Sequence, residues 1–140
     1  MVTDTVVYIA GAWESKNRLA PVKRAIQNLG LTVGSSWLEE TGTNNVEGPI
    51  VLTPAMTDVA MGYANRDVEE VMSSNLFILD TIETNDRGGK DVEFGIAYFT
   101  VGDVWIVGPV RNVFQNLADR IFDNWDEALE AIKNGDADPQ

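Results

Sequence analysis

The 140-residue sequence contains no cysteine and no histidine. The lack of cysteine excludes disulfide bonds, thiolate catalysis and zinc sites built on sulfur. The lack of histidine removes the commonest general base and the usual nitrogen ligand for metal ions. If the protein is an enzyme, its acid–base chemistry must therefore come from Asp, Glu, Tyr or Lys side chains.

Basic residues are also scarce, with 10 Lys and Arg against 22 Asp and Glu, which gives a formal net charge of −12. Such a charge repels polyanions, so we expect neither a nucleic-acid partner nor an anionic membrane surface. No apolar run approaches the roughly 20 residues that span a bilayer. The N-terminus lacks the basic segment of a secretory signal. We therefore expect a cytoplasmic protein.

Short apolar runs alternate with segments of helical periodicity along the chain. Strands are expected at 4–10, within 31–40, and at 75–80, 103–107 and 120–122, and helices at 15–29, 55–73, around residue 93 and at 125–133. This alternation predicts one α/β domain over residues 1–140, with a frayed tail from about residue 134. The sheet is expected to be doubly wound, five-stranded and mainly parallel, with helices on both faces, as in flavodoxin-like or Rossmann-like folds.

The helical spacing also predicts which positions face the core. The inward positions of the first two helices are expected to be Leu19, Val22, Ile26 and Leu29, then Val59, Tyr63, Val68 and Val71 or Met72. Four glutamates are expected to be solvated, namely Glu69, Glu70, Glu127 and Glu130. A long loop is expected at 41–54, and loops of that length are often functional.

In parallel sheets, ligands bind beyond the carboxyl ends of the strands. The chain has no Walker phosphate loop, and its first strand ends in AGAW without the dinucleotide fingerprint. The remaining candidates at that edge are carboxylates and aromatics. Trp13 and Trp37 are candidates for stacking on a base, although either residue also fits a core or lid position. Asp80 either caps the turn after its strand or faces a ligand.

Glu93 is unusual because it stands between the apolar residues Val92 and Phe94. We expect it in the first turn of a helix opened by Gly88 and Gly89, where the helix dipole and free N–H groups favour the ionised form. An ionised carboxylate in a partly dry pocket is suited to attack on an anomeric carbon that develops cationic character. The alternative is a glutamate that only complements the helix dipole.

Four segments resemble the nucleoside 2-deoxyribosyltransferase family and its N-glycoside hydrolase relatives. They are VYIAGAW, the run from NRD to NLFILD, RGGKDVEFGIAY and VGPVRNVF, in the same order from residue 6 to about residue 132. The resemblance implies an enzyme that cleaves the N-glycosidic bond of a (deoxy)nucleoside through a covalent glycosyl-Glu93 intermediate and transfers the sugar to another nucleobase. It also implies that no metal or organic cofactor is needed, and that the protein is a homo-oligomer in which a neighbouring subunit closes the site.

The resemblance assigns roles to individual residues. Glu93 matches the nucleophile, Tyr8 the tyrosine that orients it, and Asp67 the aspartate that protonates or binds the departing base. The residues expected to bind substrate are Gly11, Trp13, Trp37, Asp80, Asp86, Gly89 and Asn112.

Two departures from the family pattern leave alternatives open. The acid that the family often has six residues before the nucleophile is replaced by Arg87, with Asp86 one residue further back. The serines and arginine of relatives that act on 5′-monophosphates are represented only by Ser15 and Arg18, which favours an unphosphorylated substrate. One alternative is a nucleoside 5′-monophosphate N-glycosidase that uses water. The other is a non-catalytic module that binds a nucleoside or nucleotide.

Overall fold

The structure, a computed structural model, describes residues 5–40, 54–83 and 88–136. Its five parallel strands are in the order β2-β1-β3-β4-β5. The strands are β1 Val6–Ala10, β2 Thr32–Val33, β3 Leu76–Asp80, β4 Asp103–Val107 and β5 Arg120–Phe122. The helices are α1 Lys16–Asn28, α2 Pro54–Met72, α3 Gly89–Thr100 and α4 Trp125–Lys133, with 3-10 helices η1 Trp13–Ser15, η2 Ser36–Glu39 and η3 Val113–Leu117. The predicted doubly wound α/β fold with a five-stranded parallel sheet is confirmed.

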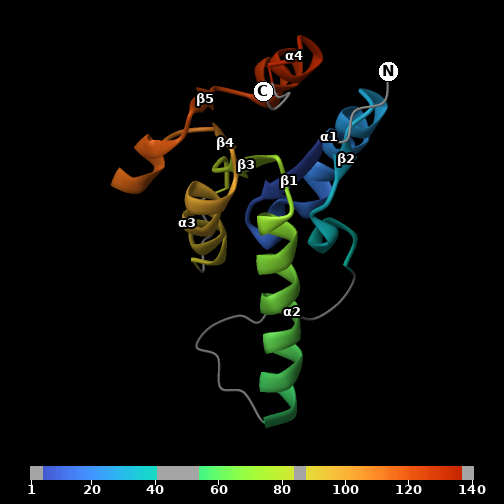
Figure 1. Cartoon of the computed structure of the whole chain (residues 1–140), viewed down its shortest axis with the longest axis vertical. Coiled ribbons are helices and arrows are strands. Elements are labelled where there is room, and N and C mark those ends of the chain that lie inside the picture. Colours follow the sequence, from blue (N-terminus) through green and yellow to red (C-terminus); the bar gives the residue numbers. More distant parts are fainter. Residues whose placement is uncertain (1–4, 41–53, 84–87, 137–140) are drawn as a thin grey trace.

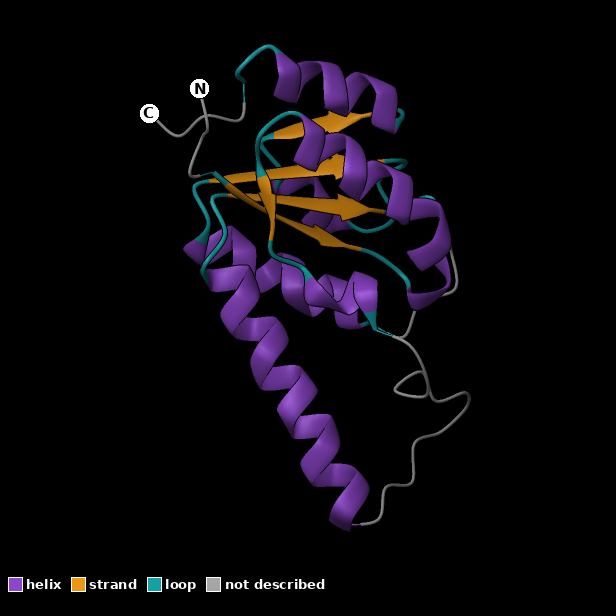
Figure 2. Cartoon of the chain, turned by 90° about the vertical axis from the view of Figure 1, so that its right-hand side faces the viewer, coloured by secondary structure: helices purple, strands orange, loops and turns teal. Residues whose placement is uncertain are grey.

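The helices cover the two faces of the sheet in pairs, and β3 shows which pair covers which face, since successive side chains of a strand point to opposite faces. Phe77 in β3 contacts the rings of Tyr8 in β1 and Phe94 in α3, on the face that α2 and α3 cover. Asp80, at the end of the same strand, points to the other face and bonds to residues of α1 and α4. Figure 1 shows α1 and α4 on one side of the strands and α2 and α3 on the other. Figure 2 shows the strands running side by side between these layers.

The central strand β3 is buried along its whole length. Its sequence LFILD is apolar up to the final acid, as expected for a strand covered on both faces. The strands on either side of it, β1 and β4, are almost equally buried. This core fixes the carboxyl ends of three adjacent strands. In the part of the chain that the structure describes, no helix is long and apolar enough to cross a membrane.

The strand expected within 31–40 is much shorter than predicted, because β2 ends at Val33. Side chains replace it beside β1. The Ser35 hydroxyl accepts a hydrogen bond from the Ile9 N–H at 3.1 Å, and the Trp37 indole donates to the Ile9 carbonyl at 2.7 Å. The N–H and C=O groups of Ile9 therefore have hydrogen-bond partners without a longer β2, and the chain continues as η2.

The predicted inward positions are only partly correct. Leu19, Ile26 and Val71 are fully buried, whereas the prediction was wrong for Leu29 and Val59, whose exposed fractions are 37% and 59%. Val59 is exposed because the N-terminal half of α2 extends beyond the other described elements (Figures 1 and 2). Met72, offered as an alternative to Val71, is also exposed. The expected loop up to residue 53 and the tail after residue 136 lie outside the described residues.

Candidate active site

The site is built around a hydrogen bond between β1 and α3. Tyr8 is fully buried, and its hydroxyl donates to Oε2 of Glu93, 85 residues away. The Tyr8 ring stacks on Phe77 with a centroid distance of 5.7 Å and an interplanar angle of 4°. Phe94 contacts the other ring of that stack edge-on at 6.4 Å. The stack on Phe77, itself packed against Phe94, therefore holds the tyrosine ring in place and fixes the direction in which its hydroxyl points.

Glu93 does not lie in the first turn of α3, so that prediction was wrong. The helix begins at Gly89, and Asp91 is the acid of its first turn. Glu93 comes a full turn after the N-cap residue, Gly88, where backbone N–H groups are already used within the helix. Its carboxylate therefore gains little from the free N–H groups at the helix start.

The ionised form of Glu93 is disfavoured by its surroundings. Burial raises the pKa of this carboxyl group to about 8, and the charges of Asp67 and Glu70 act in the same direction. The hydrogen bond from Tyr8 acts against them and lowers the pKa. The pKa of Tyr8 itself is raised by burial and by the charge of Glu93, so its hydroxyl keeps its proton and remains a donor. Carboxylates with strongly raised pKa values are typical of catalytic sites.

Asp67 faces this pair from α2. Its Oδ1 accepts a hydrogen bond from Nη2 of Arg66 at 3.0 Å, and Arg66 also forms an ion pair with Glu40. Burial raises the pKa of Asp67, although Arg66 lowers it. A raised pKa makes a carboxyl group a better candidate for giving a proton to a leaving group.

Glu70 was expected to be solvated, and this prediction was wrong. Its Oε1 accepts hydrogen bonds from the backbone N–H and the hydroxyl of Ser36, at 3.1 and 3.0 Å. The contact joins α2 to the start of η2 and brings a second negative charge near Glu93. Ser36 and Glu70 are 34 residues apart. Helical periodicity alone gave no signal for this contact.

Asp80 is bound on the opposite face of the sheet. Its two oxygens accept hydrogen bonds from Nη1 and Nη2 of Arg18 at 3.0 and 2.8 Å, from the Trp125 indole at 2.7 Å and from the Ile82 N–H at 3.1 Å. Arg18 also contacts Glu83 at 3.2 Å. The structure therefore joins Asp80 to α1 and α4, and does not join it to Tyr8 and Glu93.

The two tryptophans lie together at the carboxyl end of β1. The ring centroids of Trp13 and Trp37 are 6.3 Å apart, with Trp37 buried and Trp13 half-buried. Gly11 precedes them at a place with little room for a side chain, since an added Cβ would lie 3.3 Å from Leu19 Cδ1 and 3.5 Å from Asp80 Cβ. These three residues stand at the sheet edge where ligands of parallel sheets bind.

The remaining predicted residues are Gly89, Asn112 and Asp86. Gly89 is the exposed first residue of α3. Asn112 caps η3 by accepting a hydrogen bond from the Gln115 N–H, and it donates to Asp91 at 3.3 Å. Asp86 lies outside the described residues. Within the ranges that the structure describes, no group of three or more acidic side chains could hold a metal ion.

Three solved structures have the same arrangement of strands and helices. A 2-deoxyribosyltransferase from Bacillus psychrosaccharolyticus matches with a TM-score of 0.67 and 17% identity, over 89% of this chain and 90% of that one. The CMP N-glycosidase BcmB of Clostridium botulinum matches with a TM-score of 0.59 and 15% identity, over 93% and 99%. A conserved protein of Enterococcus faecalis V583 matches with a TM-score of 0.67 and 18% identity, over 95% and 99%. The fold is shared with enzymes that process N-glycosidic bonds.

Neither a protein-family model nor a curated protein matches this chain. The likeness to the 2-deoxyribosyltransferase is therefore one of fold, spread over nearly the whole of both chains. On that fold, the predicted catalytic residues Tyr8, Asp67 and Glu93 gather on the α2 and α3 face. Asn112 is separated from them by α3. A helix turns by about 100° per residue, so Glu93 points about 160° away from Asp91, the residue that Asn112 contacts.

Proposed function

We propose that this chain cleaves the N-glycosidic bond of a (deoxy)nucleoside, with Glu93 as the nucleophile, and transfers the sugar to another nucleobase. The observation that carries the proposal is the partly buried hydrogen bond from the Tyr8 hydroxyl to the Glu93 carboxylate. A neutral donor on one oxygen leaves the other oxygen of Glu93 for attack and fixes its direction. The shared fold of the 2-deoxyribosyltransferase and the CMP N-glycosidase supports the same class of reaction.

In the proposed first step, an ionised Glu93 oxygen bonds to C1′ while the bond from C1′ to the base nitrogen breaks. The electron pair of that bond leaves with the base, and the base takes up a proton from Asp67, whose raised pKa suits this role. The product is a glycosyl ester of Glu93. In the second step, a nitrogen of a second nucleobase attacks C1′ and gives up its proton to the Asp67 carboxylate. The ester bond breaks, its electron pair returns to the oxygen, and Glu93 is released ionised. The transition states have oxocarbenium character, which a sugar lacking the electron-withdrawing 2′-hydroxyl reaches more easily.

Hydrolysis of a nucleoside 5′-monophosphate is the second candidate, favoured by the likeness to the CMP N-glycosidase. In that reaction, water opens the glycosyl ester. Arg18, the candidate for contacting a 5′-phosphate, is already bound to Asp80 and Glu83 through three of its nitrogens. This engagement favours transfer from an unphosphorylated nucleoside. The likeness to the family also implies a homo-oligomer.

The test is base exchange between thymidine and adenine, with all products separated by chromatography. We expect the parent to form deoxyadenosine and thymine, and Glu93→Ala to lose at least about a thousandfold in rate. Glu130→Ala, at an exposed glutamate of α4, is the matched control and should retain the parent rate. Incubation with thymidine alone should give a protein mass increased by one deoxyribosyl group.

The products also separate the alternatives. Free deoxyribose, or its 5-phosphate from a nucleotide, would favour the hydrolytic enzyme. Binding of nucleosides without any release of base would favour the non-catalytic module. Exchange by Glu93→Ala near the parent rate would remove Glu93 from the proposed role.

A further inference from the structure

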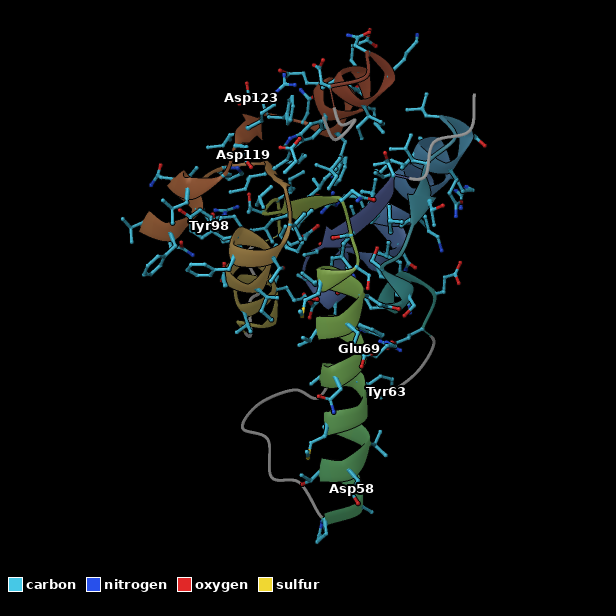
Figure 3. The ribbon with its side chains drawn as sticks, in the orientation of Figure 1. Asp58, Tyr63, Glu69, Tyr98, Asp119 and Asp123 are labelled. Carbon is cyan, nitrogen blue, oxygen red and sulfur yellow. The ribbon has the colours of Figure 1, made fainter. Side chains whose placement is uncertain are left out.

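Arg66 joins two carboxyl groups through one nitrogen. Its Nη2 contacts Oε1 of Glu40 and donates a hydrogen bond to Oδ1 of Asp67 at 3.0 Å. Glu40 is the C-cap residue of η2, whereas Arg66 and Asp67 lie on α2. The guanidinium also lies over the ring of Tyr63, with Cζ 5.1 Å from the ring centroid, on the side of α2 on which η2 lies (Figure 3). The glycosyl transfer proposed above gives a role to Asp67 but none to Arg66 or Glu40.

The bond between Arg66 and Asp67 does not follow from their places in the helix. Successive residues of an α-helix point about 100° apart, so their side chains do not face each other. The arginine therefore turns toward its neighbour, and its contacts with Glu40 and Tyr63 hold it there. The side chains of Glu40, Asp67 and Arg66 are 14%, 30% and 32% exposed. Salt screens such partly buried charges less than charges at the surface.

The bond from Arg66 determines which oxygen of Asp67 carries a proton. A guanidinium group only donates hydrogen bonds, so Oδ1 is held as an acceptor and the acid form carries its proton on Oδ2. A proton donor must lie within hydrogen-bond reach of the atom that it protonates, so its direction matters as well as its acidity. Arg66 therefore gives the proton of Asp67 one defined place.

The groups that face Asp67 come from four parts of the fold: Arg66 and Glu70 on α2, Glu40 after η2, Glu93 on α3 and Tyr8 on β1. Burial raises the pKa of Asp67, and Arg66 lowers it. The negative charges of Glu40 and Glu70 raise it again. Because Glu40 contacts the nitrogen that donates to Asp67, its charge offsets part of the effect of Arg66. A residue that first gives a proton and later takes one up must not be held strongly in either form.

We propose that Arg66 and Glu40 are positioning residues for Asp67, which they hold so that Oδ2 gives a proton to the departing base and later accepts one from the incoming base. This inference rests on the proposed glycosyl transfer, in which Asp67 is the proton donor. Arg66 fixes the acceptor oxygen and favours the ionised form, and Glu40 limits that effect. The two partners of one ion pair therefore act on Asp67 in opposite directions, whereas a pair that only stabilised the fold would not.

The first test is the ionisation of Asp67, followed by NMR through the carbon chemical shift of its carboxyl group. We expect Arg66→Gln to raise the midpoint of this titration by about one pH unit and Glu40→Gln to lower it by less. Arg66→Lys keeps the positive charge, so its midpoint should lie between those of Arg66→Gln and the parent. Asp136→Asn breaks the exposed ion pair with Arg120 at 2.8 Å and is the matched control, with an unchanged midpoint. Shifts of Arg66→Gln and Glu40→Gln in the same direction overturn the proposal, and so do two unshifted midpoints.

The second test compares two leaving groups in the base-exchange assay, after subtraction of spontaneous base loss. The base of deoxyguanosine takes up a proton as it leaves, whereas the base of N7-methylated deoxyguanosine carries a fixed positive charge and leaves without one. Glu93 attacks both nucleosides in the same way. The ratio of the rate with deoxyguanosine to the rate with the methylated nucleoside therefore reports only how well Asp67 supplies a proton.

In the parent, this ratio should fall as the pH rises through the ionisation of Asp67. Glu40→Gln should move the fall to lower pH. Arg66→Gln should lower the ratio about tenfold at low pH, where Asp67 is protonated in every variant, because the proton has lost its defined place. Equal losses on both nucleosides in Arg66→Gln would mean that the arginine only supports the fold, and would overturn this inference alone. A parent that releases no base from either nucleoside would overturn the proposed function, and this role with it.

Discussion

Two carboxyl groups, Asp80 and Glu93, lie on opposite faces of one sheet and have opposite surroundings. Asp80 accepts four hydrogen bonds, two of them from the cationic Arg18. Glu93 accepts one from a neutral hydroxyl, and its charged neighbours are the acids Asp67 and Glu70. A buried charge is tolerated where donors and an opposite charge surround it, and is costly where they are missing. Asp80 is therefore arranged to hold α1, α4 and β3 together, whereas the surroundings of Glu93 suit the nucleophile proposed above.

The largest expected effect is a loss of stability when Asp80 is replaced. Asp80→Ala removes the acceptor of Arg18 and Trp125, which leaves a partly buried cation and an indole N–H without their partner. We expect it to lower the free energy of unfolding by about 3 kcal/mol. Urea denaturation should show this loss, while Asp58→Ala on the exposed surface of α2 (Figure 3) should change stability by less than about 0.5 kcal/mol.

A double-mutant cycle separates the ion pair from other effects of Asp80→Ala. If the two residues act together, the variant carrying both Arg18→Ala and Asp80→Ala should lose less stability than the sum of the single losses. Strict additivity would mean that the pair does not link α1 to β3.

The second effect is a gain in stability, expected when the charge of Glu93 is removed. The pKa of Glu93 is raised to about 8 in the folded chain from an ordinary value of 4.5. The folded state therefore binds a proton more tightly than the unfolded state, and this contribution to stability is present below pH 4.5 and is lost as the pH rises to about 8. Glu93→Gln keeps an acceptor for Tyr8 and carries no charge. At about 1.4 kcal/mol per pKa unit, a rise from 4.5 to about 8 corresponds to at most about 5 kcal/mol. Because the Glu93 side chain is only partly buried, the variant should be more stable than the parent at pH 9 by on the order of 2–3 kcal/mol.

The measurement for Glu93→Gln is urea denaturation at pH 5, 7 and 9, with Glu130→Gln in α4 as the control. The stability difference should grow with pH for Glu93→Gln and stay flat for the control. A difference that shrinks with rising pH would show that the folded chain does not disfavour the ionised glutamate.

The third effect concerns the hydrogen bond between the two catalytic candidates. Tyr8→Phe keeps the stacking on Phe77 and removes the donor that lowers the pKa of Glu93. If the ionised form reacts, the rising limb of the pH–rate profile reports the ionisation of Glu93, and Tyr8→Phe should move that limb to higher pH. A lost hydrogen bond to a charged group corresponds to about a 10–100-fold lower rate at pH 7.

Tyr98→Phe is the control for Tyr8→Phe, because it removes a hydroxyl from the other side of α3. It should leave the pH profile unchanged. An unshifted profile in Tyr8→Phe would mean that the tyrosine supports the ring stack without orienting the glutamate.

The smallest effect comes from Glu70. Glu70→Gln keeps an oxygen for Ser36 and removes the negative charge that raises the pKa of Glu93. The rise of the base-exchange rate should move to lower pH by a fraction of a pH unit, with little change in the maximum rate. A shift to higher pH would show that the charge of Glu70 does not reach Glu93.

The sequence was informative about the fold because the central strands are continuous apolar runs such as the segment in β3. It was misleading for the length of β2. The side chains of Ser35 and Trp37 bond to Ile9 in β1, 26 and 28 residues away, in place of a longer strand. No local pattern of hydrophobicity contains that information. The exposure of Val59 was missed for a related reason. Helical spacing shows which side of a helix is apolar, but it does not show whether other elements pack against that side along the whole helix.

The residues of the candidate site were predicted from the resemblance of four ordered segments to a known family. The ionisation state of Glu93 could not be predicted in that way. Position within α3 predicted an ionised Glu93, whereas burial and two acids on α2 determine its pKa. The partners of Asp80 are 62 and 45 residues away in the sequence. Its two possible roles, capping a turn or facing a ligand, could not be separated before the positions of α1 and α4 were known.

The side chains that replace β2 beside Ile9 also affect how the chain behaves when it is crowded. An open strand edge offers free N–H and C=O groups to any other extended peptide, and this is a common route to amyloid. Here a hydroxyl and an indole already occupy those groups, and the outermost strands on both sides, β2 and β5, are very short. The sheet therefore presents little edge on which a fibril could grow.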